Sequence, residues 1–574
     1  MRWTSPLVAL AFIGLTTEIS VPLSAQSSGS AARPDTVISV ARAPRVQYVP
    51  KSSRADTLRG SYTTPSRTWW DVTFYDLHVQ VNPADSSVAG YNAITYKVLS
   101  PARELQVDLM EPLVVDSMRQ DGKAVTYRRE GAAFFAALPS APTAGTQKTI
   151  TVYYHGKPQV ARNPPWQGGF TWTTDSLGRP WIVTTDQGMG ASVWWPNKDT
   201  QADEPDSQRV ALTVPSSLQD VSNGRLRSTT KHADGTTTYE WFVKNPINNY
   251  AIAVAAGNYA HYSETYNGLK GPLSVDYWPL DYNLAAAHRQ WPQVRSMLAC
   301  FEHWFGPYPW YEDGYKLIEV PNTGMEHQSA VSYGNWFANG YRKRESSGTG
   351  LGFQWDFIIV HESAHEWFGN NVTSKDNADM WVHESFANYA EGIYTECVAG
   401  KDAGARYIVG NRRGIRNDRP IIPAYNVNDQ GSGDMYPKGG EMLHTIRQLV
   451  NDDAKWRAIL TGMNTTFRHQ TVTGAQIEAY FSTSTGVKLD KLFDQYLRTT
   501  QIPAFEYTIT GDTLRYRWAD VVPGFDMPVR VTINWPTMTL IHPTTQWQTV
   551  KVKLGNASDF RVDENFYVVP RKIP

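Results

Sequence analysis

The chain has 574 residues, too many for a single hydrophobic core, so we expect it to divide into roughly three or four domains. Its 54 Lys and Arg residues are balanced by 55 Asp and Glu residues, and without a basic surplus the chain is not expected to bind nucleic acid. Aromatic residues make up 12% of the sequence, which exceeds what a disordered protein carries and is typical of a packed globular protein.

The amino terminus resembles a secretory signal. Arg2 precedes an apolar run at residues 7–15, and small residues follow as far as Ala25. A membrane anchor is the alternative, but an uncharged span needs about 20 apolar residues and Glu18 interrupts this one. We therefore expect residues 1–25 to be a cleaved signal peptide, the mature chain to have no integral membrane span, and the protein to be periplasmic or secreted.

The pattern of the remaining chain changes three times. Residues 26–65 are rich in Ser, Ala, Pro and Arg without periodicity, which predicts a flexible leader. Short alternating segments such as DLHVQVN predict an amino-terminal β domain at residues 66–262. Longer segments with the helical period, such as WDFIIVHESAHEWFG, predict a mainly helical domain at residues 263–500. Alternation returns in VRVTINW, which predicts a small β-sandwich at residues 501–574 and an α+β multidomain fold overall.

Cys300 and Cys397 are the only cysteines in the sequence, far fewer than a disulfide framework needs even in an oxidising compartment. Cys397 continues an apolar stripe at helical spacing, and Cys300 lies in an apolar stretch. Both are expected to be small buried hydrophobic residues and not metal ligands. The pattern leaves open whether they are bonded to each other.

A metal site is predicted from the spacing of two histidines. His361 and His365 are four residues apart, so on a helix they lie on one face with Cβ atoms about 5–6 Å apart and can converge on one ion. Glu362 is rotated by about 100°, which suits a general base acting on water. Glu384, in a second helical segment, supplies the third ligand. Two His and one Glu leave a position open, as in a catalytic site with one Zn²⁺ per chain.

Structural alternatives exist for each of these residues. The alternative for the two histidines is a pair of satisfied core residues, and the alternative for Glu384 is an ordinary solvated charge on a helix. His383 is next to Glu384 in sequence, but its side chain points about 100° away, so we expect packing or a supporting contact. Asp379 is a candidate for orienting one of the ligating imidazoles through its other nitrogen.

Several segments resemble the gluzincin aminopeptidases, the family that includes aminopeptidase N and leukotriene A hydrolase. These segments are QGMGASVWWPNKDTQADEP, CFEHWFGPYPWYEDGYKLIEVPNTGMEHQ, HESAHEWFGN, MWVHESFANYAEG and YPKGGEMLHTIR, and they cover about residues 65–500. The resemblance implies a saddle-like β domain, a thermolysin-like catalytic domain and a closing β-sandwich. It assigns the zinc ligands and the base to the positions already singled out.

The resemblance also implies further site residues. Glu326, within the substrate-binding loop Gly324-Met325-Glu326, matches the acidic residue that binds the free α-amine of the substrate, and a carboxylate can make a charge-assisted hydrogen bond there. Tyr436 matches the tyrosine that stabilises the oxyanion by donating a hydrogen bond. Gln187 corresponds to a position that also approaches the amine. Taken alone, Glu326 would be interpreted as a loop charge and Tyr436 as a packing residue.

The sequence departs from the family pattern at a few positions. His327 stands where the family usually has Asn, and Asn197 stands where Cys is common. The third ligand is flanked by His383 and Ser385 instead of Asn and Gly. These differences suggest a divergent branch and leave the substrate preference open, but no ligand or base is lost.

The predicted function is a zinc metallo-aminopeptidase whose partners are peptides with a free amino terminus. A thermolysin-like endopeptidase is one alternative, and Glu326 argues against it. An inactive binding or scaffold protein is another, and the retention of every ligand and of the base argues against that. An epoxide-hydrolase side activity is a third. The sequence leaves open the side-chain preference, the limit on peptide length and the oligomeric state.

Overall fold

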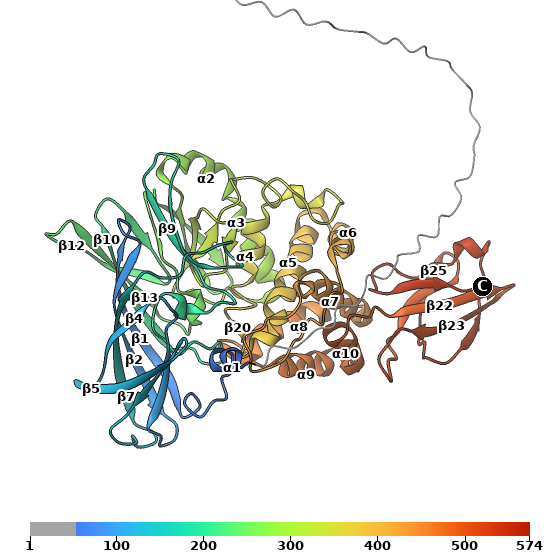
Figure 1. Cartoon of the computed structure of the whole chain (residues 1–574). Helices are drawn as coiled ribbons and strands as arrows, with labels where there is room; N and C mark the ends of the chain where they lie inside the picture. Colours follow the sequence, from blue (N-terminus) through green and yellow to red (C-terminus); the bar gives the residue numbers. More distant parts are fainter. Residues whose placement is uncertain (1–52) are drawn as a thin grey trace, which may run out of the picture. The chain divides into compact units, whose positions relative to one another are not determined.

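The computed structural model describes residues 53–574 (Figure 1). The predicted signal peptide and most of the predicted leader lie outside these residues. Within them, strands dominate up to residue 278, helices dominate from residue 284 to residue 498, and strands return from residue 504. This order agrees with the predicted multidomain α+β fold at the level of a β-rich amino-terminal part and a helical part that follows it.

The predicted leader is wrong where it enters the described residues. Helix α1 (Arg54–Gly60) begins with a capping box, in which the Ser53 hydroxyl accepts from the backbone of Asp56 and the Asp56 carboxylate accepts from the backbone of Ser53. Leu58 is buried in a cluster with residues of strand β6 (Ala133–Ala137). Polar caps and one apolar residue hold this helix, so its sequence shows no hydrophobic periodicity. The absence of periodicity is what led to the prediction of a flexible leader.

The amino-terminal part is built on a ten-stranded sheet in which β1 pairs with β2 antiparallel and with β10 parallel. Along β1, buried Leu77, Val79 and Val81 alternate with more exposed residues, as expected for a sheet with one face against a core. In sheet order the strands are β12 (Arg225–Lys231), β13 (Thr236–Val243), β10 (Ser207–Pro215), β1 (Trp70–Asn82), β2 (Ser87–Val98), β7 (Gln147–Gly156), β4 (Val114–Gln120), β5 (Lys123–Glu130), β6 and β3 (Glu104–Asp108).

Two smaller sheets follow. The first has four strands, β11 (Gln219–Val221), β14 (Ala255–Gly257), β9 (Pro180–Thr185) and β8 (Gly169–Thr174). The second has five, β15 (Tyr262–Gly268), β16 (Gly271–Trp278), β17 (Tyr315–Glu319), β19 (Val331–Tyr333) and β18 (Gly324–Met325). The second sheet therefore belongs to the part predicted to be mainly helical, and its last strand leads directly into Glu326.

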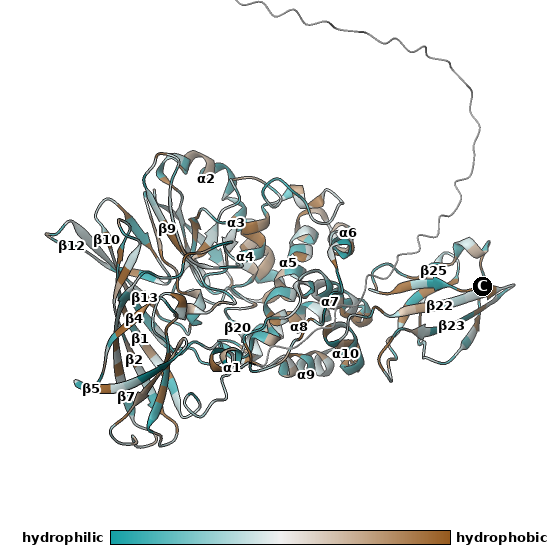
Figure 2. Cartoon of the chain, viewed as in Figure 1, coloured by the Kyte–Doolittle hydropathy of each residue, from teal (hydrophilic) through white to brown (hydrophobic). Residues whose placement is uncertain are grey.

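The helical part surrounds two central helices, α4 (Phe357–Ala364) and α5 (Trp381–Ala399), which contact each other. The Asp356 side chain caps α4 by accepting from the backbone of Ile358 and Ile359. Figure 2 shows hydrophobic residues gathered in α3 and α4, in agreement with their burial. The other helices are α2 (Leu284–Gln290), α3 (Gln293–Phe305), α6 (Lys401–Asn411), α7 (Pro437–Val450), α8 (Asp453–Thr466), α9 (Gly474–Thr485) and α10 (Asp490–Arg498), with a strand pair β20 (Val372–Ser374) and β21 (Gln470–Val472) among them.

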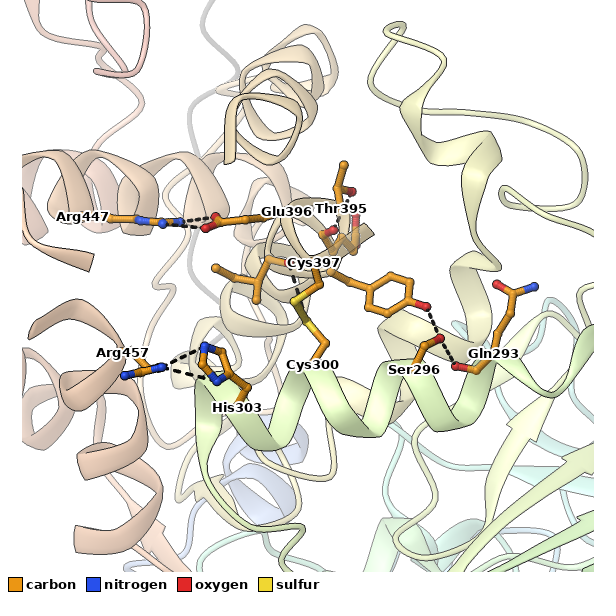
Figure 3. The surroundings of a disulfide bond; sticks show 12 residues. Gln293, Ser296, Cys300, His303, Thr395, Glu396, Cys397, Arg447 and Arg457 are labelled. Carbon is orange, nitrogen blue, oxygen red and sulfur yellow. Dashed lines mark hydrogen bonds and ion pairs between the residues drawn. A yellow bond between two sulfur atoms is a disulfide. The ribbon is translucent and has the colours of Figure 1, made fainter. Parts of the chain in front are cut away.

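A disulfide joins Cys300 of α3 to Cys397 near the end of α5 (Figure 3). Cys300 is buried, as expected, but Cys397 is exposed, so the interpretation of both as buried hydrophobic residues is wrong for Cys397. Next to it, Arg447 of α7 forms an ion pair with Glu396. The end of α5 is therefore tied covalently to α3 and electrostatically to α7.

The carboxy-terminal part contains a four-stranded sheet and a separate hairpin. The sheet consists of β26 (Gln548–Lys551), β23 (Thr513–Ala519), β22 (Ala504–Thr510) and β27 (Val569–Lys572), and the hairpin of β24 (Val529–Asn534) and β25 (Thr537–Ile541). Among residues 53–574, no helix has both the length and the apolar composition that a bilayer crossing requires.

Candidate metal centre and active site

The structure brings His361, His365 and Glu384 together. Their ligand atoms lie within 4.8 Å of one another, and all three residues are buried. Glu384 Oε2 is 3.6 Å from His361 Nε2 and 3.4 Å from His365 Nε2. His365 is the C-cap of α4 and keeps helical dihedral angles, so both imidazoles project from the same face of that helix.

The far nitrogen of each imidazole is occupied by another group. His361 Nδ1 lies 2.9 Å from Glu391 Oε1, and His365 Nδ1 lies 2.9 Å from the carbonyl oxygen of Phe368. Glu391 is itself fixed, because the Tyr407 hydroxyl donates to its Oε2 at 2.8 Å. These contacts fix the ring orientations and direct both Nε2 atoms toward Glu384.

The predicted role of Asp379 is wrong. Its carboxylate accepts from the Tyr425 hydroxyl at 2.8 Å and from the backbone of Gly474 at 2.7 Å, and no contact with a ligating imidazole is present. Glu391 takes the role instead. A sequence signal existed, since Glu391 follows Glu384 by seven residues on α5, which places both carboxylates on one face of the helix.

The donor atoms of this centre fit a zinc ion. Two imidazole nitrogens and one carboxylate oxygen form the donor set typical of a catalytic zinc site with an open position. Glu384 Oε2 is buried and makes no hydrogen bond within the described part of the chain, although buried polar atoms rarely lack a partner. The other carboxylate oxygen accepts from Gln187 Nε2 at 2.8 Å. One oxygen is thus held by the protein, and the other is free to bind a metal.

A second group of side chains adjoins this centre. The ligand atoms of Glu326, Glu362 and His365 lie within 4.8 Å of one another. Glu326 is buried, and its Oε1 has no hydrogen-bond partner among the described residues. Burial raises the pKa of the Glu326 carboxyl to about 7, and nearby Glu384 contributes to the increase. Burial also raises the pKa of Glu362 above its usual range, against the lowering effect of the two imidazoles. A cationic group entering beside Glu326 would favour its ionised form.

Strand β18 passes so close to α4 that a side chain at position 324 would displace its neighbours. A Cβ atom at this position would lie 2.7 Å from Glu362 Oε1 and 2.9 Å from Ile358 Cγ2. Such distances are shorter than van der Waals contact. Gly324 therefore allows the strand and the Glu362 carboxylate to approach each other.

A cavity of about 580 Å³ contains these groups. It is lined by the three predicted ligands and by five further predicted site residues, Gln187, Gly324, Glu326, Glu362 and Tyr436. Met325 is buried and does not line this cavity, so its predicted part in substrate binding is not supported by a contact.

Tyr436 lies against the metal centre from the start of α7. Its ring stacks on His361 with centroids 5.9 Å apart and an interplanar angle of 25°. Burial raises the pKa of the Tyr436 phenol well above its usual range, and nearby carboxylates raise it further. The hydroxyl therefore stays protonated at neutral pH and can act as a hydrogen-bond donor.

Two histidines that are next to predicted site residues in sequence, His383 and His327, have structural contacts. His383 is fully buried, and its Nε2 accepts from the backbone of Ser374 at 2.9 Å, in agreement with the expected packing role. His327 is also buried, with Nδ1 3.1 Å from the Ser332 hydroxyl. Neither imidazole lines the cavity.

Comparisons with known proteins find a family similarity in the helical part. Residues 292–496 match the peptidase family M1 domain, a range that includes all three predicted ligands. This part of the chain is therefore similar to the peptidase family M1 domain.

Two curated relatives illustrate the relationship. The chain is 24% identical over 492 residues to aminopeptidase N of Lactobacillus helveticus, covering 76% of this chain and 52% of that protein. It is 23% identical over 400 residues to aminopeptidase B of Mus musculus, covering 63% of this chain and 58% of that protein. The chain thus spans between half and three fifths of the length of these relatives.

A solved structure shares the fold. It is a mutant M1 zinc metallopeptidase from Deinococcus radiodurans bound to a Tyr-Ser-Ala substrate, with a TM-score of 0.65 and 20% identity. The alignment covers 78% of this chain and 98% of that chain. At this identity the similarity supports the fold, a β-rich part followed by a helical part.

Proposed function

We propose that the chain is a hydrolase, a zinc metallo-aminopeptidase that removes single residues from the amino ends of peptides. The observation that carries the proposal is the buried Glu326 carboxylate, which adjoins Glu362 and His365 and has one oxygen without a hydrogen-bond partner among residues 53–574. An α-ammonium group is the feature that distinguishes a peptide terminus from an internal residue, and Glu326 is positioned to bind it. The relatives named aminopeptidase N and aminopeptidase B support the same activity.

His361, His365 and Glu384 would hold the zinc ion, which when bound supplies a Lewis acid for the scissile carbonyl and lowers the pKa of water. Glu362 accepts a proton from the attacking water and later passes it to the leaving amine. The Tyr436 hydroxyl donates a hydrogen bond to the oxygen on which negative charge develops.

Gln187 has a positioning role in this proposal. Its Nε2 donates to Glu384 Oε1 and thereby fixes the carboxylate of a predicted ligand. Gln187 also lines the cavity, which supports its predicted position near the substrate amine. The hydrogen bond from Gln187 to Glu384 is the observed contact that supports this positioning role.

A decapeptide and its acetylated twin provide the test. Zinc-loaded enzyme should release residues one by one from the free peptide and leave the twin intact, as followed by mass spectrometry. Glu326→Gln should lose roughly 30-fold to several thousand-fold in kcat/KM on the free peptide, since deleting one partner of a buried charge pair costs about 2–5 kcal/mol. Early internal cuts in both peptides would instead establish an endopeptidase.

Glu345→Gln is the matched control for this experiment. Glu345 also lines the cavity, but its carboxylate accepts from Ser347 and from the backbone of Gly348. This variant should keep the discrimination between the free and the acetylated peptide. Equal loss in both variants would show that any change of charge in the cavity is sufficient, and Glu326 would lose its assigned role.

We also propose the finer architecture that the resemblance implies. The ten-stranded sheet supports a saddle-like β domain, and the arrangement of α4 and α5 supports a thermolysin-like catalytic domain. The four-stranded sheet and the hairpin after residue 504 support a closing β-sandwich. Small-angle scattering and limited proteolysis at residues 262 and 500 would test these boundaries.

Export to the periplasm or beyond the cell is part of the proposal. The Cys300–Cys397 disulfide supports it, because such bonds persist mainly in oxidising compartments. Sequencing the amino terminus of the mature protein should place it after a cleavage near Ala25. A mature chain that retains residues 1–25 would contradict this part.

A further inference from the structure

One wall of the cavity extends away from the metal centre on the His361 side. The Phe357 ring stacks on the His361 ring with centroids 5.2 Å apart, and the Tyr341 ring meets Phe357 edge-on, also at 5.2 Å. Tyr341 and Arg344 close a tight turn by reciprocal backbone hydrogen bonds of 2.9 and 3.0 Å. This aromatic wall therefore continues into Arg344, whose side chain also lines the cavity.

Arg344 brings a guanidinium group to a cavity that is lined by several carboxyl groups. Within the described residues it is the only Lys or Arg in the lining, whereas the acidic lining residues are Glu326, Glu345, Glu362, Glu384 and Glu391. Arg344 is exposed, and its guanidinium makes no ion pair or side-chain hydrogen bond with any residue from 53 to 574. The carboxylate of its sequence neighbour Glu345 accepts hydrogen bonds from the backbone of Ser347 and Gly348.

A nearby arginine shows the contrast. Arg342, in the same turn, donates to the carbonyl oxygen of Asn322 at 2.8 Å and lies over the ring of Trp336. Arg342 is thus used to hold the loop. The guanidinium of Arg344 is left free to bind a ligand.

The position of Glu326 gives the site a direction. Glu326 adjoins His365, whereas the aromatic wall begins with Phe357 at His361, and the two imidazole centroids are 5.1 Å apart. A peptide with its amine at Glu326 and its scissile carbonyl between the imidazoles can continue along this wall toward Tyr341 and Arg344, which line the same cavity. Its carboxyl end approaches the free cation.

We propose that Arg344 binds the free carboxylate of short peptides and so makes peptides with two free ends the preferred substrate class. This inference depends on the proposed aminopeptidase function for the direction of the substrate. A guanidinium can bind a carboxylate through two parallel hydrogen bonds. Each additional extended residue moves the carboxylate away by about 3.3–3.6 Å, so long peptides cannot use this contact.

The test compares a tripeptide acid with its carboxamide twin. The wild type should hydrolyse the acid roughly tenfold more efficiently in kcat/KM, which is the effect of a charge-assisted hydrogen bond at an exposed site. Arg344→Gln should lower kcat/KM for the acid to the value for the carboxamide. The wild-type preference should weaken in 0.5 M salt, because salt screens exposed charges, and it should disappear for a decapeptide acid and its amide.

Lys343→Asn is the matched control. Lys343 belongs to the same turn and carries the same charge, but it does not line the cavity. Its φ of 62° is left-handed, a conformation that Asn tolerates well. This variant should keep the preference for the acid. Loss of the preference in both variants would indicate a general effect of charge and would overturn the assignment to Arg344.

A binding measurement separates this inference from the proposed function. In zinc-loaded Glu362→Gln protein, calorimetry should show roughly tenfold tighter binding of the acid than of the amide, and the added Arg344→Gln change should abolish the difference. Equal binding of the twins by Glu362→Gln protein, or a preference that survives Arg344→Gln, would overturn the inference. If the wild type releases no amino-terminal residue while the binding preference holds, the proposed function fails and the role of Arg344 stands.

Discussion

Replacing Glu391 by Gln should weaken zinc binding although no ligand is removed. The carboxylate lies 2.9 Å from His361 Nδ1 through Oε1 and accepts from the Tyr407 hydroxyl through Oε2. An amide can present only one oxygen, so its NH₂ group must face one of these two partners. Loss of such a supporting contact typically lowers metal affinity by about 10–100-fold, equivalent to about 1.4–2.7 kcal/mol.

The assay is a zinc dissociation constant obtained by competition with a chromogenic chelator. Asp379→Asn is the control, because Asp379 is also a buried carboxylate but bonds to Tyr425 and Gly474. Thermal unfolding of both zinc-free variants shows whether either change disturbs the fold. An unchanged zinc affinity in Glu391→Gln, or an equal loss in Asp379→Asn, would refute the reasoning.

Four further outcomes are expected. Glu362→Gln should keep stoichiometric zinc by metal analysis and lose about 10²–10⁴ in kcat, because an amide cannot accept the proton of water; retention of a tenth of the rate would contradict this. Tyr436→Phe should lower kcat by about 10²–10³ with little change in KM, and an effect confined to KM would assign it to binding. Gly324→Ala should lower kcat by up to about 10² with zinc retained, since the new Cβ would displace Glu362. The Cys300→Ser/Cys397→Ser double variant should lose up to about 5 kcal/mol of unfolding free energy in urea titration, as the bond closes a loop with a sequence separation of 97; a change below about 0.5 kcal/mol would refute it.

The metal site could be predicted because it depends on local periodicity. His361 and His365 share one helical face, and Glu384 lies on a second strongly helical segment, so short-range spacing was sufficient. Glu391 was accessible by the same argument, seven residues after Glu384. Asp379 was a wrong choice because its partners, Tyr425 and the first residue of α9, are distant in sequence, and a local pattern does not reveal such contacts.

Other features depend on contacts between distant segments and could not be predicted from local patterns. Gln187 and Glu384 are 197 residues apart in sequence and meet through one hydrogen bond. The partners in the disulfide are also distant, and nothing in the spacing of two cysteines indicates that they are bonded. Helix α1 escaped prediction because its caps are polar and only Leu58 is buried.

Several site residues lie at the ends of regular elements, and this position explains how one cavity is assembled from separate segments. Glu326 follows β18 directly, His365 is the C-cap of α4, Glu384 lies in the first turn of α5, and Tyr436 precedes α7. At an element end the backbone is anchored on one side by packing, while the side chain can face open space on the other. Polar groups placed there reach the cavity without crossing the apolar core, which would be costly. The precision of the site therefore depends on how these elements pack on one another, and this is why a Cβ at Gly324, which contributes no chemical group, is expected to disturb catalysis.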